Sequence, residues 1–370
     1  MEAATVSAGG TARRRSRGVP ERRLAWYMVS PSLVLIALVA LYPIVYALWL
    51  SLHQYSLLQA GLVRWAEPNI LSNYTTPLWG DTSSEFWEAT RTTFVFTFFS
   101  VALELILGVA MALAMHAAFK GQGILRTVIL VPWAMLTVVT AITWRTIFEP
   151  ELGFTNTLLG AVGLPDDTVW LGQSPEALMV MILADVWKTA PFMALLVLAG
   201  LQVIPTELYE AGKVDGATAW QRFTKITLPL LKPAILVALI FRTLDALRIF
   251  DLPYVLTQGA HGTNTLSLIS YETFGANRLY GEGSALAILT FLIVMAVSAI
   301  YIFTVGGNQL GEGCEKTGHR HAIVIDAVEP SFRPGFAHIA ERSHLLLALG
   351  CRFLGRVGRF HGMHARKIRR

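Results

Sequence analysis

The sequence predicts an all-α integral membrane protein with six transmembrane helices. Of its 370 residues, 54% are hydrophobic and 15% are charged, which is too apolar for a soluble domain of this size. Residues 24–52 and 283–311 contain no charged side chain, and about 20 apolar residues are enough to cross a bilayer core as a helix. A polar segment at 205–233 separates two apolar runs and carries helix signals of its own.

The first apolar run, 24–52, is predicted to be a span rather than a cleaved signal peptide. Arginines precede it, as they precede many signal peptides, but the run is too long for a signal h-region and shows no small-residue cleavage pattern. Residues 1–23 are therefore a basic N-terminal segment. Four further candidate spans follow before the last one, at 92–119, 124–144, 178–204 and 233–256, so that the membrane domain covers residues 24–305.

The distribution of basic residues predicts a multi-pass protein of the cell membrane with both ends in the cytoplasm. Residues 145–176 contain one basic and five acidic side chains, and basic residues concentrate on the cytoplasmic side of a membrane. The large outer segments are then 53–91, 147–176 and 257–282. The basic residues on the predicted inner side are Arg13, Arg14, Arg15, Arg17, Arg22, Arg23, Lys120, Arg126, Lys213, Arg222, Lys225 and Lys232.

The polar segment 205–233 is predicted to start with a short helix. Thr206 is suited to cap it, and Glu207 and Glu210 would lie near its N-terminus, where the helix dipole favours negative charge. Gly216 is suited to end it, because glycine tolerates the left-handed conformation that often follows a helix.

A second short helix is predicted directly after the first. Thr218 and Gln221 have the spacing of a capping box, and Pro229 and Pro233 are expected to end the helix. The product is a compact pair of helices at the inner face. From the residues alone, two interpretations remain open: a helix that docks into a groove of a partner protein, or an amphipathic segment that lies on lipid headgroups.

The same segment resembles the EAA signature of permease subunits of ABC importers. The matching residues are Glu210-Ala211-Gly212, then Gly216, then Ile226-x-Leu228-Pro229, and Gly212 stands where the pattern has alanine. The resemblance implies a type I ABC importer permease fold in which this loop, the coupling loop, contacts a separate ATPase. It implies coupling roles for Glu207, Glu210, Ala211, Gly212, Asp215, Gly216, Leu228 and Pro229, with Asp215 hydrogen-bonding within the turn.

Further residues are similar to the carbohydrate branch of this family, which includes maltose and glycerol-phosphate permeases. Tyr42-Pro43, Asn73-Tyr74 and the run 241–245 belong to them, and Val186-Trp187-Lys188-Thr189 looks most like the first permease subunit of trehalose-recycling importers. The resemblance implies import of a disaccharide such as trehalose. The implied partners are a second homologous permease subunit, two copies of a cytosolic ATPase, an extracytoplasmic sugar-binding lipoprotein and membrane lipid, with no nucleic acid.

ATP and Mg²⁺ are expected on the partner ATPase, and no cofactor is expected on this chain. The only Gly-Lys pair, Gly212-Lys213, is followed by Val214 and lacks the preceding glycine-rich loop of a nucleotide-binding site. No catalytic or metal-ligand spacing stands out, since His53, His116 and His261 lie in separate segments. The rival interpretations are a proton- or ion-coupled secondary transporter and an integral membrane enzyme.

Ionisable residues inside the predicted spans are costly and therefore mark either a structural charge cluster or a translocation path. One interpretation is mutual neutralisation that holds spans together, with Lys188–Asp245 and Arg242–Asp245 as allowed pairs. The other is contact with sugar hydroxyls, with Trp144, Trp187, Phe192 or Tyr254 stacking on the sugar ring. The substrate-path candidates are Trp187, Lys188, Phe192, Arg242, Asp245 and Arg248; Glu104 and Asp185 are the other charged residues at this depth.

The composition changes after the last span. Residues 306–370 contain eleven basic and five acidic side chains and six of the nine histidines. Cys314 and Cys351 fall here, on the predicted reducing side, so a disulfide is not expected. We interpret 306–370 as a poorly ordered basic tail without a role in import; a metal- or lipid-binding appendage is the alternative.

Overall fold

The computed structural model describes residues 21–55, 64–66, 70–117, 120–151, 153–163, 165 and 167–301, with side chains from residue 26 onward. The predicted tail 306–370, both cysteines and most of the basic N-terminal segment lie outside these residues. Within them the chain is mostly helical, and the one sheet is a two-stranded antiparallel ribbon of β1 (His53–Gln54) and β2 (Arg64–Trp65).

Among the described residues, five helical segments are long and apolar enough to cross a membrane. The first, Trp26–Ser51, combines α1 (Glu21–Ile36), a π-helical turn η1 (Ala37–Leu41) and α2 (Tyr42–Ser51). The others are α4 (Ser83–His116), α8 (Glu176–Gln202), the segment Ala219–Ala246 that ends in α11 (Leu228–Ala246), and α14 (Tyr280–Tyr301).

The predicted span 124–144 is broken rather than straight. It consists of α5 (Gln122–Ala134) and α6 (Thr137–Ile147), which are bent by 92° and pass the same test only as a pair. Pro132 lies in the last turn of α5, where it cannot donate a backbone hydrogen bond, and Met135 and Leu136 are extended. Counting the pair as one span gives the six that the sequence predicts.

The predicted helix over 233–256 is wrong at both ends. The helical segment begins at Ala219 and ends at Ala246, and residues 251–256 form a separate short helix, α12 (Asp251–Leu256). Pro229 and Pro233 do not end the helix that begins at Ala219. A π-helical turn, η3 (Phe223–Thr227), precedes them, and Pro229 falls in the first turn of α11, where a missing amide hydrogen is tolerated.

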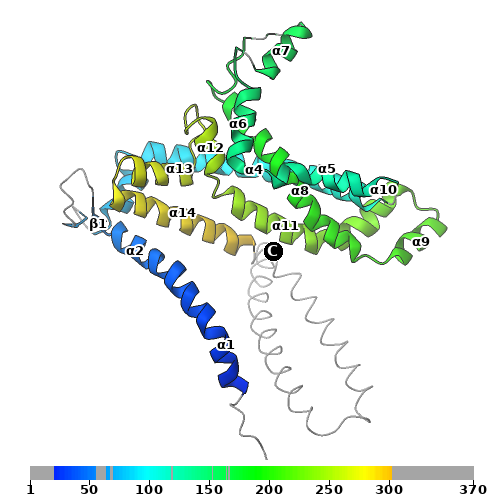
Figure 1. Ribbon diagram of the computed structural model, residues 1–370, viewed down its shortest axis with the longest axis horizontal. Helices are drawn as coiled ribbons and strands as arrows, with labels where there is room; N and C mark the ends of the chain where they lie inside the picture. Colours follow the sequence, from blue (N-terminus) through cyan, green and yellow to red (C-terminus); the bar gives the residue numbers. More distant parts are fainter. Residues whose placement is uncertain are drawn as a thin grey trace, which may run out of the picture.

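Short helices connect the spans. On the predicted outer side these are α3 (Ser72–Trp79), α7 (Phe154–Ala161), α12, and α13 (Leu266–Tyr271) with its π-helical continuation η4 (Glu272–Ala276). On the predicted inner side they are α9 (Thr206–Val214) and α10 (Ala219–Arg222). Figure 1 shows α9 and α10 at one end of the bundle and β1 and α13 at the other.

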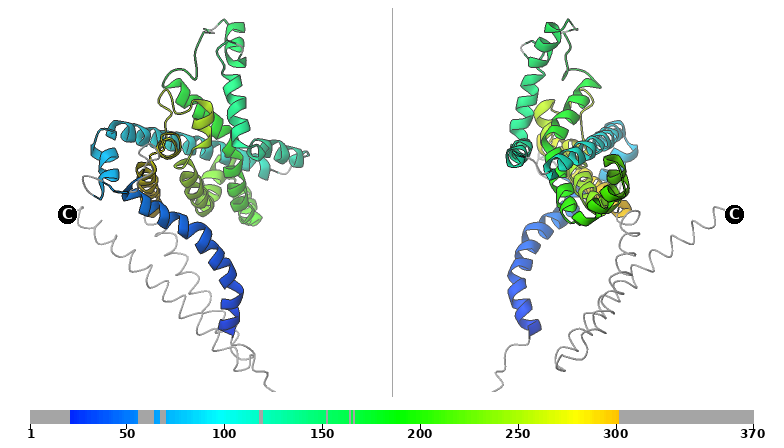
Figure 2. Two further views of the ribbon diagram at one scale, coloured as in Figure 1. Left: turned by 60° about the vertical axis from the view of Figure 1, so that its left-hand side comes forward. Right: turned by 90° about the vertical axis from the view of Figure 1, so that its right-hand side faces the viewer.

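The core forms around α8, which packs along α4 and α11. In the most apolar stretch of α8, 61% of the residues are buried, whereas in that of α1 and α2 only 6% are buried. Two glycines let the backbones approach: a Cβ on Gly108 of α4 would lie 2.6 Å from Met193 of α8, and one on Gly200 of α8 would lie 2.4 Å from Ala234 of α11. Figure 2 shows α1 extending away from this bundle.

Candidate functional site

The coupling loop folds as two helices in the predicted order, but only the first, α9, is short: the second, α10, continues through η3 into α11 as the helical segment Ala219–Ala246. The helix α9 ends at Val214, Gly216 follows in the left-handed conformation (φ 75°), and the Ala217 amide donates to the Gly212 carbonyl at 2.9 Å. This backbone closure is a glycine-based helix stop. The predicted end of the first helix is therefore confirmed.

The second helix, α10, begins with the predicted capping box. The Thr218 hydroxyl accepts from the Gln221 amide at 3.3 Å, and the Gln221 side-chain oxygen accepts from the Thr218 amide at 2.8 Å. The Arg222 guanidinium donates to the Ala217 carbonyl at 2.6 Å and so ties α10 to the turn. Each limb of the loop therefore has its own local stabilisation.

Two local expectations about the loop are wrong. Thr206 does not cap α9: the cap position is Pro205, and no side chain satisfies the first amides. The Asp215 carboxylate makes no hydrogen bond to the turn within the described residues, because the backbone bond and Arg222 already close it. Proline suits the cap position here because its own missing amide needs no partner.

The two limbs pack against each other through a small residue. Gly212 is buried, and a Cβ at this position would lie 3.2 Å from the Ile226 Cδ1 atom and 3.5 Å from Arg222. The Tyr209 and Thr227 hydroxyls are 3.1 Å apart, which joins α9 to η3. Tyr209 also packs against the core cluster of α4, α8 and α11. The loop is therefore fixed to the membrane helices rather than lying free.

The outer surface of the coupling loop is exposed and mixed in character. Exposed apolar side chains include Val214 (88%) and Trp220 (71%). Among the predicted coupling residues only Gly212 is buried; Glu207, Glu210, Ala211, Asp215, Gly216, Leu228 and Pro229 are all exposed. Such a surface can contact another protein.

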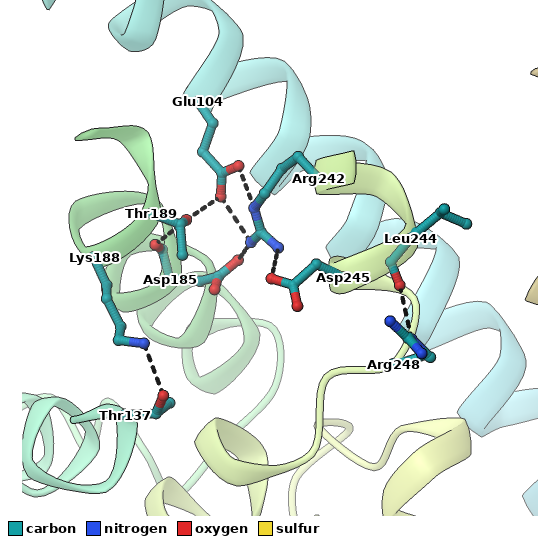
Figure 3. Close-up of polar contacts among 9 residues, drawn as sticks. All are labelled: Glu104, Thr137, Asp185, Lys188, Thr189, Arg242, Leu244, Asp245 and Arg248. Carbon is teal, nitrogen blue, oxygen red and sulfur yellow. Dashed lines mark hydrogen bonds and ion pairs between the residues drawn. The ribbon is translucent and has the colours of Figure 1, made fainter. Parts of the chain in front are cut away.

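A cluster of charged residues lies between α4, α8 and α11, and Arg242 is at its centre (Figure 3). The Arg242 side chain is 2% exposed. Its guanidinium contacts the Glu104 carboxylate through Nε (2.5 Å) and Nη2 (2.8 Å), the Asp185 carboxylate through Nη2, and the Asp245 carboxylate through Nη1 at 3.0 Å. The predicted Arg242–Asp245 pair is confirmed, and its partners on α4 and α8 extend it across three helices.

Lys188 has a different partner from the one predicted. Its ammonium donates to the Thr137 hydroxyl at 2.7 Å, and no ion pair with Asp245 occurs among the described residues. Thr137 is the first residue of α6, so Lys188 ties α8 to the half-span that follows the bend. Asp245 is satisfied by Arg242 on its own helix, one turn away.

A polar cavity of about 150 Å³ opens beside this cluster. Five of the predicted substrate-path and buried charged residues line it together, and α12 contributes its first two residues to the lining. The charged lining consists of three acidic and three basic side chains, Asp185, Asp245, Asp251, Lys188, Arg242 and Arg248. The cavity therefore offers hydrogen-bond donors and acceptors in near balance, which suits a polyhydroxylated neutral molecule.

The aromatic candidates do not line this cavity. Trp187 forms an edge contact with Trp144 of α6, their centroids 6.2 Å apart, and Phe192 stacks on Trp133 of α5. Tyr254 packs against Phe250 and Tyr271. The structure thus groups Lys188, Arg242, Asp245 and Arg248 and leaves Trp187 and Phe192 beside α5 and α6.

Apolar helices long enough to cross a membrane, a polar loop packed against them and a polar cavity between them are the features of a membrane transport subunit. The chain belongs to the family of binding-protein-dependent transport system inner membrane components, whose model matches residues 104–306. It is the permease subunit of an ABC importer, and ATP hydrolysis belongs to a separate chain.

Characterised relatives match most of the chain. A trehalose/maltose transport permease of Thermococcus litoralis is 42% identical over 285 residues, which cover 76% of this chain and 93% of the relative. A trehalose transport permease of Mycobacterium tuberculosis is 42% identical over 303 residues (80% and 94%). A sulfoquinovosyl glycerol transport permease of Agrobacterium fabrum is 39% identical over 285 residues (76% and 90%).

The fold is also that of a solved importer. A chain from a bacterial ABC transporter involved in import of the acidic polysaccharide alginate aligns with a TM-score of 0.66 at 23% identity, covering 76% of this chain and 94% of that chain. This likeness confirms the predicted permease fold.

Proposed function

We propose that this chain is the permease of an ATP-driven importer for a neutral disaccharide, with trehalose the foremost candidate. The observation that carries the proposal is the 42% identity, over at least 76% of the chain, to two permeases whose names include trehalose. The near balance of charges around the polar cavity is consistent with an uncharged sugar. The relative that transports sulfoquinovosyl glycerol makes an anionic glycoside the alternative to test.

The coupling loop is proposed to pass motion from the ATPase to the spans. Its exposed residues would meet a groove of the ATPase, and its contacts through Gly212 and Tyr209 to η3 connect it to α11. The helix α11 carries Arg242 and Asp245, so displacement of the loop would reach the polar cavity along one continuous helical segment. Glu210 is proposed to anchor the loop on the ATPase.

The polar cavity is proposed to form part of the translocation path. Asp245, whose side chain is 72% exposed, and the exposed Arg248 would bind sugar hydroxyls, together with Lys188. Arg242, held by Glu104 and Asp185, would form the fixed polar wall. Trp187 and Phe192 lie outside this cavity, beside α5 and α6, and are proposed to add apolar faces to the path beyond it.

The remaining partners are proposed on the family relationship. They are a second homologous permease subunit, two cytosolic ATPases that bind ATP and Mg²⁺, and an extracytoplasmic sugar-binding lipoprotein. The low burial of α1 and α2 within this chain leaves surface for another subunit or for lipid. Both chain ends are proposed to lie in the cytoplasm.

The test is uptake of radiolabelled trehalose by the assembled importer in proteoliposomes, with ATP inside and binding protein outside. We expect uptake that requires ATP hydrolysis and that Glu210→Ala abolishes or strongly reduces, with loss of ATPase co-purification or of sugar-stimulated ATP hydrolysis. Glu151→Ala, an exposed acid between α6 and α7, is the matched control.

Three results would each contradict one part of the proposal. Uptake that continues without ATP hydrolysis but follows an ion gradient would identify a secondary transporter. Full ATP-driven uptake by an assembled Glu210→Ala complex would remove the coupling role of the loop. Uptake of an anionic glycoside in preference to trehalose would change the substrate class and leave the ATP-driven mechanism in place.

A further inference from the structure

A second and larger cavity, about 400 Å³, lies away from the charged cluster. We call it the outer pocket, because residues from two predicted outer segments, 147–176 and 257–282, line it together with the end of α6. Its polar lining consists of Arg145, Glu149, Thr257, Gln258 and His261. Its volume falls within the range of about 300–1,000 Å³ that is usual for small-ligand sites.

The chain after α12 is held in an unusual conformation at this pocket. Gln258 and His261 both have positive φ (53° and 57°) although neither is glycine. Such backbone conformations cost free energy, persist only where the surrounding structure holds them, and cluster at functional sites. The loop is fixed on both sides: the Thr257 and Thr263 hydroxyls are 2.5 Å apart, and the Thr92 hydroxyl of α4 donates to the Gly262 carbonyl.

The opposite wall is fixed by a buried amide. Asn156 of α7 is 4% exposed; its side-chain nitrogen donates to the Pro150 and Thr168 carbonyls at 3.0 Å, and its oxygen accepts from the Trp170 indole at 2.7 Å. Val169 and Leu171, which flank Trp170 in the sequence, line the pocket. Both walls are therefore preorganised, which reduces the ordering cost of binding a ligand.

A series of aromatic rings links the two cavities. Trp187, next to Lys188 of the polar cavity, contacts Trp144; Trp144 stacks on Phe148 at 5.7 Å; and Phe148 meets Trp170 at 5.6 Å, beside the outer pocket. The six-residue helix α12 makes a second link. Its first two residues line the polar cavity and its last, Leu256, lines the outer pocket, a separation of about 6–7.5 Å at the helical rise.

We propose that the outer pocket is a second sugar subsite, which holds a hexose unit before it reaches the polar cavity. Arg145 and Gln258 supply donors and Glu149 supplies an acceptor for hydroxyl groups. Val169, Leu171 and Leu256 supply apolar surface for the C–H faces of a pyranose. The inference rests on the proposed import of a disaccharide. It assigns to this pocket a ligand of the same chemical class.

The direct test is protection of an engineered thiol by trehalose. Arg145→Cys is prepared in the assembled importer with Cys314 and Cys351 replaced by serine, and its labelling by a membrane-impermeant methanethiosulfonate is measured without binding protein. We expect trehalose to slow labelling at least threefold, and mannitol, a linear polyol without a ring, to have a smaller effect. Thr146→Cys, the exposed neighbour that does not line the pocket, is expected to be labelled without protection.

Absence of labelling at Arg145→Cys, or labelling that trehalose leaves unchanged, would overturn the inference. Protection of both cysteines to the same extent would do so as well, since it would report a general change of conformation.

A transport measurement separates a sugar subsite from a contact with the binding protein. We expect Gln258→Ala to lower trehalose imported per ATP hydrolysed at least threefold, with the half-saturating concentration of binding protein within twofold of wild type. A raised half-saturating concentration with unchanged import per ATP would identify a docking contact and overturn the inference. If the wild-type complex shows no ATP-driven trehalose uptake, the proposed function itself fails. If the wild-type complex imports trehalose and the pocket variants import it equally well, only the inference about the outer pocket fails.

Discussion

Arg242 is the residue whose environment departs most from that of an ordinary membrane helix. Its guanidinium is enclosed by carboxylates from α4 and α8 as well as from its own helix. Buried ion pairs add little net stability compared with apolar packing, because desolvation offsets attraction. Removal of one partner is different, because it leaves the other charges buried without compensation.

We therefore expect Arg242→Ala to destabilise the permease by about 3–5 kcal/mol, the range for breaking a buried ion pair. Thermal unfolding of the purified complex and the yield of folded protein measure this. Arg248→Ala is the matched control, since Arg248 is exposed and its Nε donates to the Leu244 carbonyl. Equal melting temperatures for the two variants would show that the cluster does not hold the helices together.

Two glycines of the coupling loop respond differently to the same change. A Cβ at Gly212 would lie 3.2 Å from the flexible end of Ile226, whereas Gly216 has a left-handed φ of 75°. We expect Gly212→Ala to retain ATPase binding and to gain up to about 1 kcal/mol of helix propensity. Gly216→Ala should lose about 1–2 kcal/mol of local stability, because a side chain disfavours this conformation.

Amide hydrogen exchange across 206–226 distinguishes the two glycine variants. Slower or equal exchange in Gly212→Ala and faster exchange in Gly216→Ala is the expected pair of results. Faster exchange in both would mean that the contact between the two limbs has no room for a methyl group.

At the level of elements, the second limb of the coupling loop begins with a capping box at α10, the first turn of the helical segment Ala219–Ala246. Thr218→Ala removes the hydroxyl that accepts from the Gln221 amide, and loss of such a cap costs about 1 kcal/mol. We expect faster amide exchange over 219–223 and weaker co-purification of the ATPase. Thr224→Ala is the control, because the Thr224 hydroxyl donates only to carbonyls of the preceding turn; an equal effect there would rule out a role for the cap.

The sequence predicts features of an element that depend on near neighbours. The Thr218–Gln221 box and the Gly216 stop are confirmed, because each involves residues within a few positions of one another. The helix stop assigned to Pro229 and Pro233 is wrong, because a π-helical turn at 223–227 changes the hydrogen bonding ahead of them. Glu104 and Arg242 are 138 residues apart, and no local pattern indicates that pairing.

At the scale of the whole molecule, the number of membrane crossings depends on the bent pair α5–α6. If the pair crosses the membrane, six spans place α9 and α10 on the same side as the N-terminus. If it enters and leaves on one face, α8 runs in the opposite direction and the coupling loop lies outside. The concentration of basic residues in the loop, among them Lys213, Arg222 and Lys225, favours the first arrangement.

Cysteine labelling in intact cells decides between these arrangements. With Cys314 and Cys351 replaced by serine, Asp81→Cys, exposed between α3 and α4, and Lys213→Cys, exposed in α9, are treated with a membrane-impermeant maleimide. We expect Asp81→Cys to be labelled directly and Lys213→Cys only after the membrane is permeabilised, because six crossings put an odd number of spans between them. Labelling of both in intact cells would mean that α5 and α6 form a re-entrant loop. The coupling loop would then face away from ATP, and Glu210 could not contact a cytosolic ATPase.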